Sequence, residues 1–201
     1  MEEVLRHVSG NPAPRRILDF GCGTGNTSAL LAASFPQAEV CGVDTSQPAL
    51  QSARERFGDH RTRFESASRI SEIGLFDLAY VNGVFHHISP EDRGDWVRSI
   101  QMALHPGGRL MFFENNPYSP AARLVMHRIP FDRDAIMIWP RQAGHLLRSG
   151  GFATPYPTRF LFIFPRALGW LRPTEPLFSR LPLGAQYLVV GERSEPRHFD
   201  D

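Results

Sequence analysis

The sequence contains no lysine, and all 22 of its basic residues are arginine. A chain without lysine cannot form a lysine Schiff base, anchor pyridoxal phosphate or complete a P-loop nucleotide site. Cysteine is also scarce, since Cys22 and Cys41 are the only two. Their spacing matches no metal-ligand pattern, so we expect no disulfide, no metal site and a reducing compartment.

Long hydrophobic runs are lacking as well. No apolar stretch reaches the roughly 18 residues of a membrane span, and no apolar run follows the acidic start Met1-Glu2-Glu3. We therefore expect neither a membrane span nor a secretory signal, and a cytoplasmic location. With 42% hydrophobic and 21% charged residues, the chain has a globular composition. It is expected to form a single domain over residues 1–201.

The net charge of +1 hides an uneven distribution along the chain. Residues 1–122 hold 11 arginines against 14 acidic residues, whereas residues 123–180 hold nine arginines against three. The arginine-rich segment is either a solvated surface or a site for an anionic group, because the guanidinium pairs bidentately with carboxylate and phosphate. The near-neutral total argues against a nucleic-acid partner.

Short apolar runs alternate with helical patterns in the first two thirds of the chain. The pattern predicts helices over 26–35 and 46–57, and another from Ser89 to the turn at 105–108. Seven strands are expected, at 16–20, 39–43, 61–65, 76–81, 110–113, 159–164 and 185–190. This alternation is typical of an α/β fold with a mostly parallel sheet and helices on both faces.

The amino-acid composition changes after Glu114, because ten of the 17 prolines lie between residues 115 and 182. A helix is predicted over 141–147, flanked by proline- and aromatic-rich segments at about 115–139 and 164–183. Insertions of this length are usually functional. We expect them to form a substrate lid or wall, with Phe131, Trp139 and Trp170 as lid residues.

A glycine-rich turn over residues 21–25 joins the first strand to the first helix. Glycines let the backbone approach a ligand, and the following helix presents free N–H groups. Asp44 lies nineteen residues after Gly25, at the end of the second strand, where a carboxylate suits a ribose diol. The dinucleotide fingerprint Gly-x-Gly-x-x-Gly fails in both frames, because its third glycine would fall on Asn26 or Ser28.

Four motifs together resemble class I S-adenosylmethionine-dependent methyltransferases of the small-molecule type with His-His after strand four. They are residues 18–25, the pair Val43-Asp44, residues 76–88 with His86-His87, and the turn at 104–108. The resemblance covers residues 15–115 and implies a Rossmann-like methyltransferase fold with S-adenosylmethionine as cofactor. The cofactor-binding residues that it implies are Asp19, Gly21, Cys22, Gly23, Asp44, Thr45, Ala67, Ser68, Asn82 and Gly83.

Candidate catalytic and substrate residues follow the fourth and fifth strands. His86 and His87 are candidate bases at the rim of the sheet, and Glu114 ends strand five, where sites form in parallel sheets. Consecutive histidines point in different directions, so one of the two is expected to reach the site. The substrate candidates are Asn115, Tyr118, Arg123 and His127, of which the last two share a helix face.

The leading interpretation is an enzyme that methylates a small molecule, at an oxygen of an acceptor carrying an anionic group. The arginines nearest to the expected acceptor site are Arg123, Arg128, Arg133 and Arg141. Two alternatives stay open: a non-catalytic domain that binds the same cofactor, and, disfavoured by the failed fingerprint, an NAD-dependent oxidoreductase. The sequence is compatible with a monomer or a homodimer, and it does not identify the acceptor.

Overall fold

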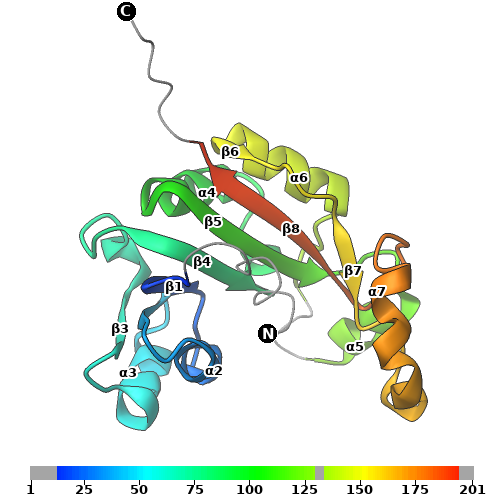
Figure 1. The fold of residues 1–201 in the computed structure, drawn as a ribbon, viewed down its shortest axis with the longest axis horizontal. Coiled ribbons are helices and arrows are strands. Elements are labelled where there is room, and N and C mark those ends of the chain that lie inside the picture. The colour runs from blue at the N-terminus through cyan, green and yellow to red at the C-terminus, as the bar shows by residue number, and fades with distance from the viewer. Residues whose placement is uncertain (1–12, 130–133, 195–201) are drawn as a thin grey trace, which may run out of the picture. The chain divides into compact units, whose positions relative to one another are not determined.

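The computed structural model describes residues 13–129 and 134–194 (Figure 1). Within these ranges the chain forms two compact units. The first unit holds residues 13–81, 98–111 and 192–194, and the second holds residues 82–97 and 112–191. Each unit combines separate stretches of the chain, and a single domain over 1–201 stays a prediction.

Eight strands pair in the order β3-β2-β1-β4-β5-β8-β6, and β7 pairs with β8. β1 is parallel to both β2 and β4, β2 is parallel to β3, and β7 runs antiparallel to β8. The predicted α/β class is confirmed, but eight strands form instead of seven. The additional strand, β6, has two residues, which is too short for a hydrophobic period. The bounds are β1 Arg16–Phe20, β2 Glu39–Asp44, β3 Thr62–Ser66, β4 Phe76–Asn82, β5 Leu104–Asn115, β6 Phe152–Ala153, β7 Arg159–Leu161 and β8 Gln186–Arg193.

Helices begin where the sequence supplies capping groups. The Ser46 side chain accepts from Ala49 N before α3, and Ser119 does the same for Ala122 N before α5; both caps are followed by proline in the first turn. The α-helices are α2 Asn26–Ser34, α3 Gln47–Phe57, α4 Arg93–Met102, α5 Pro120–Arg128, α6 Pro140–Ser149 and α7 Glu175–Phe178. The 3₁₀ segments are η1 Ala67–Arg69, η2 Phe85–His87 and η4 Arg166–Thr174.

The prediction that a helix opens at Ser89 and runs to residue 105 is wrong at both ends. Ser89 Oγ donates to Asp92 Oδ2 at 2.6 Å, so this pair closes a turn ahead of α4 instead of capping the helix. The helix ends at Met102, and β5 already begins at Leu104. Gly107 has φ +77° within this strand, so the predicted turn is a local bend in β5.

The prediction of a core strand over residues 159–164 is correct only for the first half of that segment. β7 ends at Leu161, and the backbone of Phe162 turns into the left-handed region at φ +57°. The Phe162 side chain is 59% exposed. The two proline-rich segments contain α5 in the first and η4 with α7 in the second, so both are partly helical. No helix in the described part of the chain is long and apolar enough to cross a bilayer.

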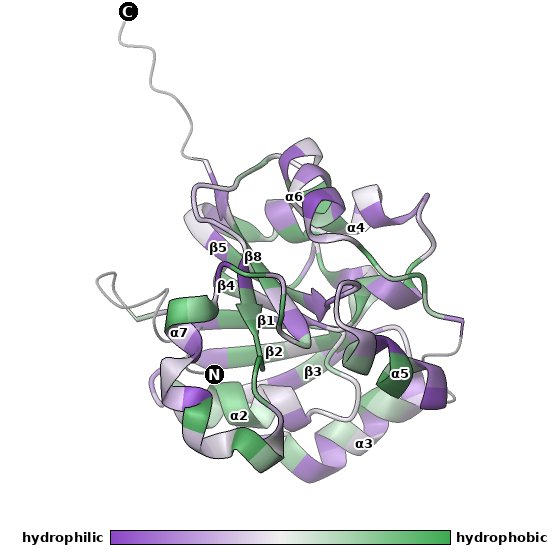
Figure 2. Ribbon diagram, turned by 90° about the vertical axis from the view of Figure 1, so that its right-hand side faces the viewer, coloured by the Kyte–Doolittle hydropathy of each residue, from purple (hydrophilic) through white to green (hydrophobic). Residues whose placement is uncertain are grey.

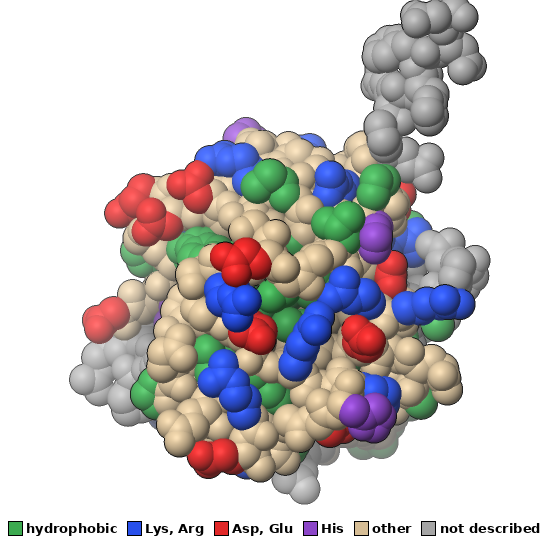
Figure 3. All heavy atoms as spheres, turned by 90° about the vertical axis from the view of Figure 1, so that its left-hand side faces the viewer, with side chains coloured by type: hydrophobic (Ala, Val, Ile, Leu, Met, Phe, Trp, Pro, Cys, Tyr) green, Lys and Arg blue, Asp and Glu red, His purple; other side chains and the backbone are tan. Residues whose placement is uncertain are grey.

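The core of the first unit consists of strands buried on both faces. Four of the five β1 residues and four of the six β2 residues are buried, which explains their near-continuous apolar sequence. On the surface of this unit, arginines are paired with acids: Arg69 bonds both Glu65 and Glu72, and Arg16 contacts Glu39. Figure 3 shows a face on which arginine and acidic side chains are interspersed.

Candidate functional site

The glycine-rich turn of the first unit ties the ends of β1 and β2 together. The backbone N–H groups of Gly21 and Cys22 both donate to Val43 O, at 2.8 and 3.0 Å. Gly21, Gly23 and Gly25 have φ values of +75°, +52° and +85°, which residues with a Cβ rarely adopt. The turn therefore requires glycine at all three positions for its backbone path.

The carboxylate of Asp44 closes this turn from the side. Its Oδ2 accepts from Gly23 N and its Oδ1 accepts from Ser46 N, both at 2.8 Å. An ionised carboxylate offers about four acceptor positions, so each oxygen keeps one for a further donor. Asp44 is partly exposed, and its carboxylate can therefore accept from two neighbouring hydroxyls of a ligand.

The glycines of the turn face different surroundings. A Cβ added at Gly23 would meet nothing within 4 Å, whereas one at Gly25 would lie 2.9 Å from the Phe64 ring and 3.0 Å from atoms of Ala53 and Phe57. Gly25 is thus needed because the turn packs closely against α3 and β3. Gly23 borders open space beside Asp44, where a ligand can approach the backbone.

Asp19 and Cys22 lie beneath the turn with buried side chains. Asp19 is 2% exposed and accepts from Ser28 Oγ at 2.6 Å. Burial raises the pKa of Asp19 to about 7; the Ser28 hydrogen bond opposes this shift and the Asp44 charge adds to it. The Cys22 side chain belongs to a hydrophobic cluster with Leu50, Ala53 and Phe64, and burial raises the pKa of its thiol. Any contact between Cys22 and a ligand above the turn would therefore come from its backbone.

The other predicted cofactor residues divide between the two units. Thr45 and Ser68 are exposed at the carboxyl ends of β2 and β3, and the Ser68 hydroxyl lies 2.9 Å from that of Ser66. Ala67 is buried. Asn82 and Gly83 belong to the second unit, where Asn82 Oδ1 accepts from Gln186 Nε2 at 3.2 Å. Gly83 has φ +67° and donates its N–H to Phe113 O.

In the second unit, Glu114 holds the turn that carries the two histidines. Its Oε1 accepts from Val84 N at 3.1 Å and from Phe85 N at 2.7 Å, and its Oε2 lies 2.6 Å from His86 Nδ1. When His86 Nδ1 carries a proton, it donates that proton to Glu114 Oε2. The side chains of His86 and Glu114 are 2% and 1% exposed, whereas His87 is exposed. Glu114 and His86 therefore hold each other inside the unit, and His87 is the histidine that solvent reaches.

Arg93 holds the same turn from its carbonyl side, a role that the sequence did not indicate. Its Nε donates to Phe85 O and Ile88 O, both at 3.0 Å, and its Nη2 donates to Ile136 O at 2.8 Å. Ile136 N in turn donates to His86 O at 2.9 Å. Burial lowers the pKa of Arg93, and the nearby Glu114 charge opposes that shift. One buried guanidinium thus connects the histidine turn to the segment that precedes α6.

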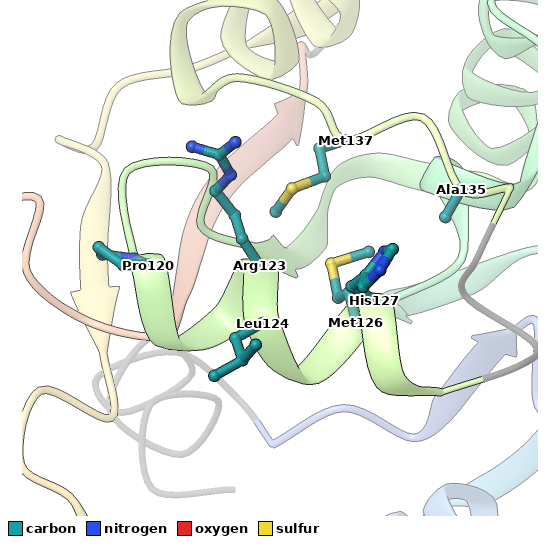
Figure 4. A pocket seen from close by; sticks show the side chains of 7 residues that line it. All are labelled: Pro120, Arg123, Leu124, Met126, His127, Ala135 and Met137. Carbon is teal, nitrogen blue, oxygen red and sulfur yellow. The ribbon is translucent and has the colours of Figure 1, made fainter.

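That segment forms one wall of a cavity of about 480 Å³ in the second unit. Figure 4 shows Arg123, Met126 and His127 projecting from α5 toward the stretch that carries Ala135 and Met137. The lining of the cavity is therefore mostly apolar and includes the sulfur atoms of Met126 and Met137. Arg123 adds one permanent positive charge. In the described part of the chain, no acidic side chain pairs with Arg123 or His127.

A second cavity of about 500 Å³ is lined by Tyr118, Arg141 and Arg148, together with Gly144 and Thr158. Tyr118 packs edge-on against Trp139 with ring centroids 5.0 Å apart. Asn115 lines neither cavity; its Oδ1 lies 3.5 Å from Gln186 Nε2. The four predicted substrate residues are therefore separated: Arg123 and His127 share the first cavity, Tyr118 lies in the second, and Asn115 is on the end of β5. Arg133 and Phe131 lie outside the described residues.

Comparisons with known proteins agree with this organisation. A family model described as a methyltransferase domain matches residues 18–110. A trans-aconitate 2-methyltransferase of Variovorax paradoxus is 32% identical to this chain, covering 96% of the chain and 81% of that protein. The malonyl-[acyl-carrier protein] O-methyltransferase of Legionella pneumophila is 36% identical over 109 residues, which are 52% of this chain and 38% of that protein. Apart from the Variovorax protein, the chain spans less than half the length of the first curated relatives it matches.

Solved structures show the same fold. An S-adenosylmethionine-dependent methyltransferase from Mesorhizobium loti superposes with a TM-score of 0.67 at 24% identity, covering 95% of this chain and 96% of that one. A methyltransferase from Archaeoglobus fulgidus gives a TM-score of 0.69 at 15% identity, with coverage of 96% and 92%. Together with the Variovorax relative, which matches most of both sequences, these findings show that the chain belongs to the class I S-adenosylmethionine-dependent methyltransferases.

Proposed function

We propose that this protein transfers the methyl group of S-adenosylmethionine to an oxygen of a small acceptor that carries carboxylate groups. The observation that carries the proposal is the first cavity of the second unit, where Arg123 and His127 lie beside apolar side chains and pair with no acid among the described residues. An arginine in such a cavity binds a carboxylate in bidentate fashion. The names of the Variovorax and Legionella relatives support acceptors of this charge.

The first unit offers groups that suit the cofactor. Asp44 has two free acceptor positions for the ribose hydroxyls, and Gly23 leaves open space beside them. When bound, S-adenosylmethionine supplies a methyl group on a sulfonium, which an oxygen nucleophile can attack in line. We assign Asp44 to the ribose, the turn around Gly23 to the methionine part, and Thr45 and Ser68 to the adenine side.

A carboxylate acceptor changes what the histidines need to do. Its oxygen is already ionised at neutral pH, because carboxyl groups have pKa values near 4, so no base has to remove a proton. Positioning then supplies most of the rate acceleration. On this view His86, held by Glu114, keeps its turn in place, and the exposed His87 is available to contact the acceptor.

Arg123→Gln tests the acceptor side of the proposal. The loss of a charge-assisted hydrogen bond costs about 1.5–3 kcal/mol, so KM for trans-aconitate, the first acceptor to try, should rise roughly tenfold to a hundredfold. The affinity for S-adenosylhomocysteine should stay unchanged. The control is Arg128→Gln, which removes an exposed arginine of the same helix that does not line the cavity. An equal change in KM for both variants would refute the assignment of Arg123.

Asp44→Ala tests the cofactor side. Calorimetry should show S-adenosylhomocysteine binding weakened by about 1.5–3 kcal/mol, whereas Glu55→Ala, at an exposed acid on α3, should leave it unchanged. Unchanged affinity in the Asp44 variant would show that the ribose lies elsewhere.

A further inference from the structure

The segment formed by residues 162–183 places large hydrophobic side chains in water. Trp170 is 75% exposed and Leu177 is 82% exposed. Of the sixteen large hydrophobic side chains exposed in the described part of the chain, seven lie in this short segment: Phe162, Leu168, Trp170, Leu177, Phe178, Leu181 and Leu183. Seven exposed hydrophobic side chains within residues 162–183 make this segment a candidate interaction surface, because proteins that act alone rarely expose large apolar patches.

The backbone of the segment is nevertheless well anchored. Phe164 N donates to Glu175 Oε1 at 3.0 Å, and Phe160 N donates to Ser179 O at 2.6 Å. Farther along, Asn116 Nδ2 donates to Pro182 O and Gly184 O. These hydrogen bonds attach the segment to the fold, while seven of its large apolar side chains are exposed. In Figure 2, part of the ribbon at α7, which contains Leu177 and Phe178, is green for hydrophobic residues.

Phe162 adds an independent sign of function. It is the one residue other than glycine with a positive φ among the described residues, at +57°. A Cβ makes this conformation unfavourable, and the fold does not bury the phenyl ring in return, since 59% of the side chain stays exposed. The strained backbone places the Phe162 ring in an exposed position. A partner that buries this ring would explain the strain.

The charge around these side chains is positive. Residues 164–183 contain three arginines and one acid, Glu175, whose carboxylate is engaged by the backbone. Arg172 and Arg180 are exposed and pair with no acidic side chain that the structure describes. The second cavity, which Pro182 helps to line, adds Arg141 and Arg148. Tryptophan, phenylalanine and leucine beside arginine are typical of segments that lie in the interface of a membrane.

We propose that residues 162–183 dock this protein on a bilayer that contains anionic lipids. The aromatic and leucine side chains enter the headgroup region, and Arg172 and Arg180 contact lipid phosphates. A second copy of the chain fits this surface less well. A two-fold symmetric dimer would bring two arginine-bearing surfaces together, and residues 164–183 supply only one acid, Glu175, to pair with them. The proposal does not depend on the identity of the methyl acceptor.

Vesicle co-sedimentation with the full chain tests the proposal. The protein should bind phosphatidylcholine vesicles that contain about 30% phosphatidylglycerol and bind pure phosphatidylcholine vesicles weakly, with binding reduced by salt. Trp170→Ser combined with Leu177→Ser should lower binding at least about tenfold. The matched control, Leu30→Ser with Met102→Ser, replaces exposed hydrophobic residues of the first unit and should bind as the unmodified protein does.

Arg172→Gln with Arg180→Gln provides a second, independent measurement. This variant should lose about tenfold or more of its binding to the anionic vesicles and keep its weak binding to phosphatidylcholine. Affinity for S-adenosylhomocysteine should be unchanged in every variant, which separates this test from that of the proposed function. The proposal is overturned if the unmodified protein binds neither kind of vesicle, or if the control and the Trp170 variant bind equally. It is also overturned if sedimentation shows self-association that these variants abolish, without vesicle binding.

Discussion

Replacing Asp19 with asparagine is expected to make the folded protein more stable, increasingly so as the pH rises. Asp19 is buried beneath the glycine-rich turn and accepts one side-chain hydrogen bond, from Ser28. Burial raises the pKa of Asp19 from 3.8 to about 7. Asparagine keeps an oxygen that accepts from Ser28 but carries no charge, so it removes the cost of burying a carboxylate.

The magnitude follows from the two pKa values of this group. Between pH 4 and pH 7 the folded chain retains a proton that the unfolded chain has released, so the free energy of unfolding falls as the pH rises through this window. A shift of about three units at 1.36 kcal/mol per unit corresponds to about 4 kcal/mol. The stability that protonated Asp19 contributes is fully present below its pKa in the unfolded chain and is lost above its pKa in the folded chain. Near pH 8 the asparagine variant should therefore be more stable by up to about 4 kcal/mol.

Urea unfolding of both proteins near pH 5 and pH 8 measures this effect. The advantage of the variant should grow by about 2–3 kcal/mol between the two pH values. Asp59→Asn is the control: backbone N–H groups of Arg61 and Thr62 lower the pKa of Asp59, so both pH values lie above its titration and its effect should not change between them. A destabilised Asp19→Asn variant near pH 8, or an effect that does not depend on pH, would contradict a raised pKa for the buried Asp19.

Two further pairs of variants each compare a closely packed position with an exposed or open one. Glu114→Ala should destabilise the protein by about 3–5 kcal/mol in denaturant unfolding, because it leaves a buried histidine and two backbone amides without their acceptor. Glu65→Ala breaks an exposed ion pair and should cost under about 1 kcal/mol. Equal losses of stability in the two variants would contradict the structure. Gly25→Ala should cost about 1–3 kcal/mol more than Gly23→Ala, because the added Cβ also collides with Phe64. By contrast, Gly23→Ala should have the larger effect on S-adenosylhomocysteine affinity, and calorimetry of the two variants checks this ordering.

The α/β class and the place of the glycine-rich turn follow from the sequence alone. A strand that runs into glycines and then a helix is specified locally, through backbone conformations that only glycine adopts easily. The first two strands and the helices after them were therefore predictable nearly to the residue. The regions of β6 and α4 were not, because a two-residue strand has no period and the Ser89-Asp92 pair satisfies a turn as readily as a helix cap.

Which polar side chains are buried and which apolar side chains are exposed depends on contacts between distant parts of the chain. His86 and His87 are chemically identical neighbours, and the distant carboxylate of Glu114 selects the first for the interior. The role of Arg93 depends likewise on a carbonyl at Ile136, more than forty residues away. Burial is the sum of contacts that the chain makes with remote segments. For this reason the phenylalanine-rich stretch after β7 resembled core in the sequence, yet Phe162 is exposed in the fold.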